Sequence, residues 1–153
     1  MSNPITPIVP AEKIHILLAD DDELQLRLFS AYLIEAGYEV IHARDGNEAR
    51  EMARRLKPDV VLTDNRMPII EGLTLIATLH HEKETKDIPC ILLTNDDLSL
   101  EAEKVLNEIG GLYVPKAEFK THIWSALETC LAKIGKQVPG PAKAFTANLL
   151  GKQ

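Results

Sequence analysis

The feature of this 153-residue chain that most constrains its fold is an alternation, five times over, of short apolar runs with longer segments of helical periodicity. Ala49, Met52, Ala53 and Leu56 illustrate the longer segments, because apolar residues three or four positions apart lie on one face of a helix. The apolar runs show no regular alternation with polar residues, which is typical of strands buried on both faces. The expected strands cover residues 14–19, 38–43, 59–63, 89–94 and 112–114.

Strands that alternate with helices of this length indicate βαβ units. Right-handed crossovers then place helices on both faces of a parallel sheet. We therefore predict an α/β fold with a doubly wound (βα)5 parallel sheet. In such a fold the functional site lies at the carboxyl ends of the strands.

Charged and apolar residues predict where individual helices begin and which face they bury. Carboxylates are favoured at helix N-termini, so Asp22 and Glu23 are expected to start the first helix. For the same reason Asp96-Asp97 is expected to cap the fourth helix. The apolar stripe expected along the first helix comprises Leu24, Leu26, Leu28, Tyr32 and Leu33.

Composition and charge exclude several classes of protein. The chain is 45% hydrophobic and 26% charged, its apolar runs are too short to cross a bilayer, and its first residues lack the pattern of a secretory signal. All 23 acidic residues lie at or before Glu128, so residues 1–128 carry a net charge of −10 and the last 25 residues carry +4. An acidic body argues against direct binding of nucleic acid. Cys90 and Cys130 are expected to be reduced, buried thiols.

The same patterns divide the chain into three parts. We expect an N-terminal extension at residues 1–12, one folded domain at 13–135, and a Pro/Gly linker with a short basic tail at 136–153. Pro139-Gly140-Pro141 breaks the alternation. The run that follows has Ala142, Phe145 and Leu149 at helical spacing and is expected to dock weakly or to fray.

Polar residues follow the expected strands at their carboxyl ends, which meet at one edge of a parallel sheet. They are Asp20 and Asp21 in "ILLADDDE", then Asp64, Thr94 and Lys116. Crowded carboxylates repel one another, so a helix N-terminus, a metal ion or solvent must compensate them. Mg²⁺ takes carboxylate and phosphate oxygens, and a lysine ammonium suits a phosphoryl oxygen. This set of groups favours phosphoryl transfer to a carboxylate.

The chain resembles the receiver domain of bacterial two-component response regulators, of the stand-alone, single-domain type. The resemblance is carried by "ILLADDDE", "KPDVVLTDNRMPIIEG", "IPCILLTNDD" and "GGLYVPKAEF", and it runs from about Ile14 to Ile134. It implies the flavodoxin-like receiver fold with strand order 2-1-3-4-5. It also implies a cytoplasmic phosphoprotein that is not an enzyme beyond phosphorylating itself from small phosphodonors and dephosphorylating itself.

The resemblance implies a role for each residue at the strand ends. Asp64 would accept the phosphoryl group, and Lys116 would neutralise it. Asp21, Asp64 and the backbone carbonyl of Arg66 would bind Mg²⁺ directly, and Asp20 would bind it through water. Thr94 would hydrogen-bond the phosphoryl group, and Tyr113 would follow it inward. The residues that would tune the rate are Arg66, Asn95 and Asp96.

Two residues depart from the family pattern. Asn95 stands where a small residue usually follows the threonine, and Ala117 stands where a proline usually follows the lysine, commonly through a cis bond. A cis bond before a non-proline residue costs about 2.5–4 kcal/mol, so the sequence leaves the isomer of the Lys116–Ala117 bond open. These departures bear on the rate of phosphorylation and on the Thr94–Tyr113 coupling.

The resemblance also implies partners. A histidine kinase or a histidine phosphotransfer protein would supply the phosphoryl group, and a downstream protein would bind the face formed by the fourth helix, fifth strand and fifth helix. A homodimer is a further expectation, whereas a membrane partner is not. Two alternatives remain open, a pseudo-receiver that binds partners independently of phosphorylation and a haloacid-dehalogenase-like phosphohydrolase. The second would use Asp20 and Asp22 as its D-x-D pair and would leave Asp64 without a role.

Overall fold

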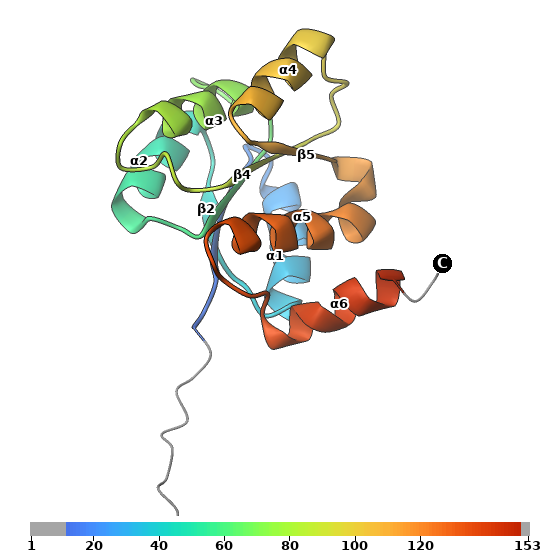
Figure 1. Ribbon diagram of the computed structural model, residues 1–153. Coiled ribbons are helices and arrows are strands. Elements are labelled where there is room, and N and C mark those ends of the chain that lie inside the picture. Colours follow the sequence, from blue (N-terminus) through green and yellow to red (C-terminus); the bar gives the residue numbers. More distant parts are fainter. Residues whose placement is uncertain (1–11, 151–153) are drawn as a thin grey trace, which may run out of the picture.

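The computed structural model describes residues 12–150, with side chains up to residue 145. Five parallel strands form one sheet in the order β2-β1-β3-β4-β5 (Figure 1). The predicted (βα)5 fold and its strand order are therefore confirmed. The strands are β1 His15–Ala19, β2 Glu39–Ala43, β3 Val60–Thr63, β4 Cys90–Thr94 and β5 Leu112–Pro115.

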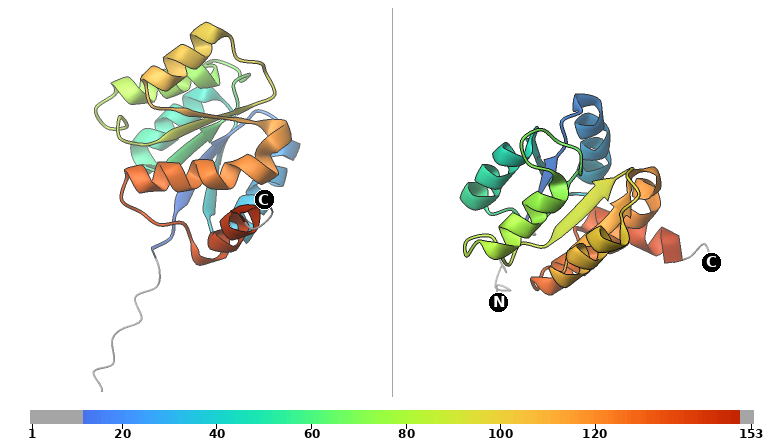
Figure 2. Two further views of the ribbon diagram at one scale, coloured as in Figure 1. Left: turned by 45° about the vertical axis from the view of Figure 1, so that its right-hand side comes forward. Right: turned by 90° about the horizontal axis from the view of Figure 1, so that it is seen from above.

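Helices cover both faces of this sheet (Figure 2). The helical elements are α1 Glu23–Glu35, α2 Gly46–Leu56, α3 Gly72–His81, α4 Leu100–Glu108, the 3-10 turn η1 Lys116–Glu118, α5 Phe119–Lys133 and α6 Gly140–Leu150. Successive strand residues point to opposite faces, so Ile16 and Leu18 pack with α1 and α5, while Leu17 packs with α2 and α3. Two apolar cores result, one on each face. None of the helices in the described part of the chain is long and apolar enough to cross a membrane.

The first helix buries only part of the stripe expected for it, namely Leu26 and Leu33, with Tyr32 packed against the core. Leu26, Phe29, Ser30 and Leu33 are its buried residues. Leu24 and Leu28 are 75% and 52% exposed, so their assignment to the buried stripe was wrong. Positions 26, 29, 30 and 33 follow the three-to-four-residue period of a single helix face, and positions 24 and 28 fall outside it.

The fourth helix begins later than expected. Its N-cap is Ser99, whose hydroxyl accepts a hydrogen bond from the Ala102 amide at 3.1 Å. The expectation that Asp96-Asp97 caps this helix was therefore wrong. The Asp96 carboxylate instead accepts a hydrogen bond from Arg66 Nε at 2.9 Å, so it is engaged elsewhere. Asp22, by contrast, caps α1 as expected by accepting from the Leu24 and Gln25 amides.

The segment after residue 135 forms α6, which packs beside α5 (Figure 1). Ala142 belongs to the core on the α1–α5 side, and the Phe145 ring stacks on Trp124 with 4.7 Å between centroids. Gly37 adopts a φ of +100°, and a Cβ there would lie 2.9 Å from Cβ of Pro139. Only glycine adopts this positive φ at low cost and also leaves room for Pro139. Gly37 thus allows the turn before β2 and the approach of the tail at the same time.

Candidate functional site

Three carboxylates converge where β1 and β3 end. Asp20 and Asp64 are only 2% and 8% exposed, whereas Asp21 is exposed. The backbone amide of Asp64 donates to the Ala19 carbonyl at 2.8 Å, which extends the ladder between these strands by one residue. As a result, one carboxylate oxygen from each of Asp20, Asp21 and Asp64 lies within 4.8 Å of the other two.

Lys116, the residue directly after β5, inserts its ammonium group between two of these carboxylates. Its Nζ lies 3.0 Å from Asp20 Oδ2 and 3.3 Å from Asp64 Oδ2. The same ammonium donates to Oε1 of Gln25, in the first turn of α1. The structure therefore brings together four of the predicted site residues. It adds Gln25, which sequence reasoning missed because no strand end marks its position.

The environment of Asp64 opposes its ionisation. Burial raises the pKa of the Asp64 carboxyl above its ordinary value, and the neighbouring Asp20 raises it further. Lys116 and a hydrogen bond from the Asn65 amide to Asp64 Oδ1 (2.8 Å) act in the opposite direction and lower this pKa. The site therefore holds more negative charge than one lysine compensates, which is the condition that favours a bound cation.

The donor set fits magnesium. All three carboxylates offer oxygen ligands, the kind that Mg²⁺ prefers, and two of them are nearly buried. The exposed position of Asp21 leaves one side of the cluster open to solvent.

The loop after β3 is held in place by close backbone contacts. The Gly72 amide donates to the Asn65 carbonyl at 2.9 Å, and the Leu73 amide donates to Asn65 Oδ1 at 3.1 Å. A Cβ at Gly72 would lie only 2.0 Å from the Asp64 carbonyl oxygen. Within the loop Ile69 adopts a φ of +73°, which is a strained conformation for a β-branched residue. Its side chain is 77% exposed.

Asp96 links the two predicted switch residues and Arg66. Its amide donates to Thr94 Oγ1 at 3.1 Å, and its carbonyl accepts from the Tyr113 hydroxyl at 3.2 Å. Its carboxylate pairs with Arg66, as described above. Thr94 is buried at the end of β4, while Asn95 beside it is exposed. A change in the Thr94 hydroxyl would therefore reach Tyr113 through a single intervening residue.

The loop that carries Lys116 contains no cis bond. None of the peptide bonds between described residues is cis, so the Lys116–Ala117 bond is trans. The 3-10 turn η1 follows directly at Lys116 and leads into α5. Lys116 thus reaches the carboxylates from a trans backbone, which answers the question that the sequence left open.

A doubly wound sheet with paired acids after β1, one acid after β3 and a lysine after β5 defines a signal-receiver domain. The family model for the response regulator receiver domain matches residues 16–128. This chain therefore belongs to the response regulator receiver family of two-component signalling.

Individual relatives agree with this assignment. The polar-differentiation response regulator DivK of Brucella anthropi is 32% identical over 101 residues, which cover 66% of this chain and 82% of DivK. A structure of the chemotaxis response regulator CheY4 of Vibrio cholerae has a TM-score of 0.62 and 28% identity, and the match covers 69% of this chain and 88% of CheY4. A response regulator structure from Chloroflexus aurantiacus reaches a TM-score of 0.71 at 28% identity and covers 79% of this chain and 99% of that one.

Proposed function

We propose that this receiver, residues 13–135, is a phosphorylation-controlled switch in which Asp64 accepts a phosphoryl group from a histidine kinase or a histidine phosphotransfer protein. The observation that carries this proposal is the Lys116 ammonium, which lies 3.3 Å from Asp64 Oδ2 and 3.0 Å from Asp20 Oδ2. In the transfer, a carboxylate oxygen of Asp64 bonds to phosphorus as the P–N bond of the phosphohistidine breaks. The electron pair of that bond remains on the imidazole nitrogen.

The residues that would hold Mg²⁺ are Asp21, Asp64 and the carbonyl of Arg66 directly, with Asp20 through water. Bound there, the ion would supply positive charge against the phosphoryl oxygens. Lys116 would give up its contact with the Asp64 oxygen and donate to a phosphoryl oxygen instead. Its hydrogen bond to Gln25 would help to hold the ammonium at the site during this exchange.

Signalling would then pass through Asp96. Thr94 would donate its hydroxyl hydrogen to a phosphoryl oxygen, which would disturb the hydrogen bond that it accepts from the Asp96 amide. The Asp96 carbonyl holds the Tyr113 hydroxyl, so Tyr113 would be released inward. The surface of α4, β5 and α5 would change and alter contacts with a downstream protein or with a second copy of the chain. Arg66, Asn95 and Asp96 would set the access of water to the phosphoryl group and hence its lifetime.

The proposal is tested by incubating the chain with acetyl phosphate and Mg²⁺ and measuring intact mass. We expect the wild type to gain one phosphoryl group and Asp64→Asn to gain none. Asp87→Asn, which removes a carboxylate at the opposite edge of the sheet, should be modified like the wild type. Addition of EDTA should abolish the gain. If the wild type stays unmodified under conditions that modify another receiver, the proposal is overturned. The chain would then be a binding module that acts independently of phosphorylation.

A further inference from the structure

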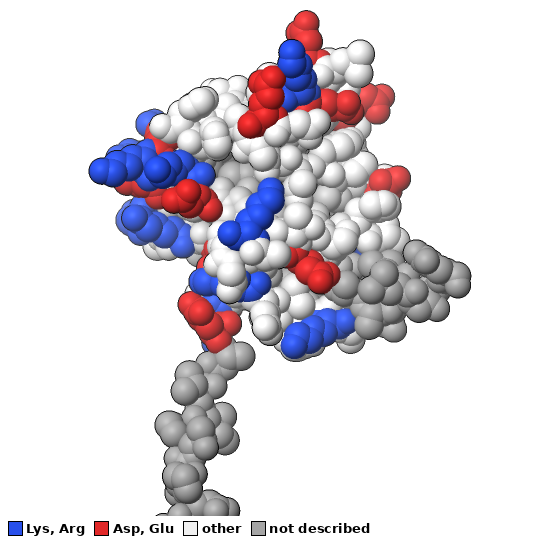
Figure 3. All heavy atoms as spheres, viewed as in Figure 1, with Lys and Arg blue, Asp and Glu red and all other residues white. Residues whose placement is uncertain are grey.

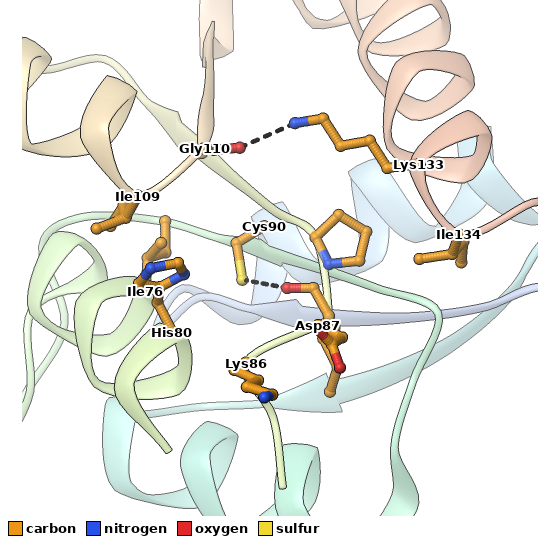
Figure 4. Close-up of a pocket in the computed structure, with 12 residues that line it drawn as sticks. Ile76, His80, Lys86, Asp87, Cys90, Ile109, Gly110, Lys133 and Ile134 are labelled. Carbon is orange, nitrogen blue, oxygen red and sulfur yellow. Dashed lines mark hydrogen bonds between the residues drawn. The ribbon is translucent and has the colours of Figure 1, made fainter. Parts of the chain in front are cut away.

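A cavity of about 460 Å³ opens at the amino-terminal edge of the sheet, opposite the edge that carries Asp64. Figure 4 shows it between the last residues of α3, α4 and α5 and the start of β4. Pockets that hold small molecules have volumes in this range. The phosphorylation chemistry proposed above makes no use of this edge, and the cavity shares no lining residue with that site.

The walls of the cavity are largely apolar. Ile76 comes from α3, Ile109 from the end of α4 and Ile134 from the end of α5, while Pro89 and Cys90 line the start of β4. The Cys90 thiol donates to the Ile88 carbonyl at 3.4 Å, so its polar hydrogen is already engaged by the chain. A ligand that fills this space would therefore need an apolar body.

The polar residues around the cavity have an excess of positive charge. Lys86 and Lys133 line it together with a single carboxylate, Asp87 (Figure 4). Lys133 Nζ donates to the Gly110 carbonyl at 3.1 Å, which holds the ammonium at the rim and leaves two of its three hydrogens for another acceptor. Neither lysine forms an ion pair within the described residues.

This local charge contrasts with other parts of the surface. The chain as a whole carries a net charge of −6, and acidic side chains gather over α4 in Figure 3. An acceptor that carries negative charge would be repelled by that region and attracted to the lysines at the cavity. The lining thus selects for an anionic group joined to an apolar body.

We propose that this cavity binds a small amphipathic carboxylate, with its hydrocarbon part against the isoleucines and its carboxylate against Lys133. Such a ligand would contact α3, α4 and α5 at their C-terminal ends. It would also contact the first residue of β4, the strand that ends at Thr94. The site is independent of Asp64, so its existence does not depend on the proposed phosphorylation.

The test is a titration of the full chain with octanoate, followed by the backbone amide signals in two-dimensional NMR. We expect saturable, single-site binding with shifts concentrated at Gly110, Gly111 and Ile134. Lys133→Gln removes the charge at nearly constant length and should weaken octanoate binding about ten-fold. Lys104→Gln removes an exposed lysine of α4 that does not line the cavity, and it should leave binding unchanged.

Octanol provides the matched ligand without a charge and should bind about ten-fold more weakly than octanoate. Equal binding of octanol and octanoate, or an unchanged affinity in Lys133→Gln, would overturn the assignment of an anion-binding group. Shifts confined to other surfaces, or no saturation at millimolar octanoate, would overturn the site itself.

Discussion

The stacking of α6 on α5 predicts a measurable share of the stability of this receiver. Phe145 is half-buried, and its ring lies 4.7 Å from Trp124 at an interplanar angle of 25°. A fully buried Phe→Ala change costs about 3–5 kcal/mol, and an aromatic pair contributes about 0.5–1.5 kcal/mol beyond its buried area. For a half-buried ring we expect Phe145→Ala to lower the free energy of unfolding by about 2 kcal/mol.

Trp124 provides the assay because it is the only tryptophan of the chain. Urea unfolding followed by its fluorescence and by far-UV circular dichroism should give the same midpoint, shifted to lower urea in Phe145→Ala. The native emission of Trp124 should also move to longer wavelength, since this indole is buried and loses part of its cover. Lys143→Ala, at an exposed position of α6, is the matched control and should stay within about 0.5 kcal/mol of the wild type.

A loss below about 0.5 kcal/mol in Phe145→Ala, with unchanged Trp124 emission, would refute this reasoning. It would mean that α6 does not rest on α5 in solution. The tail would then behave as the weakly docked segment that its Pro139-Gly140-Pro141 sequence suggested.

Three further predictions concern the core and the site. Burial raises the pKa of the Cys90 thiol to about 12 and that of the Cys130 thiol to about 11. Ellman's reagent at pH 8 should therefore modify neither thiol in the native chain and both after denaturation. Rapid modification of the native chain would contradict this. Ile69→Gly should raise the free energy of unfolding, measured with urea, by about 1 kcal/mol, because glycine adopts the positive φ without strain. A variant less stable than the wild type would contradict this prediction. Asp64→Asn should raise the melting temperature near neutral pH. The pKa of Asp64 in the folded chain is raised above its ordinary value of 3.8. Ionisation of Asp64 therefore destabilises the fold, and the free energy of unfolding falls as the pH rises from 3.8 through the folded-state pKa. A melting temperature that does not rise would count against this.

The sequence predicted the sheet and the acidic site well because both depend on short-range patterns and on topology. Buried parallel strands are apolar throughout, so the five runs identified them to within about a residue at each end. Parallel strands also bring their carboxyl ends to one edge. That rule alone predicts that Asp20, Asp64 and Lys116 lie in one cluster.

The predictions that failed depended on contacts between distant residues. The carboxylate of Asp96 was expected to cap a helix, but Arg66, 30 positions away, engages it. Gln25 contacts Lys116 across 91 positions, and no local pattern announces such a pair. Leucine at positions 24 and 28 fitted a helical stripe, yet only packing decides which of two overlapping stripes faces the core.

Two glycines at helix starts have a consequence for how this chain can vary. A Cβ at Gly46 would lie 2.3 Å from the carbonyl oxygen of Ile70, as one at Gly72 would meet the carbonyl of Asp64. Both obstacles are backbone atoms, which cannot rotate away as a side chain can. In a library of all single substitutions, positions 46 and 72 should therefore be nearly invariant among functional clones, although neither residue has an atom that could take part in the chemistry. The absence of these two side chains shapes the loop that follows Asp64.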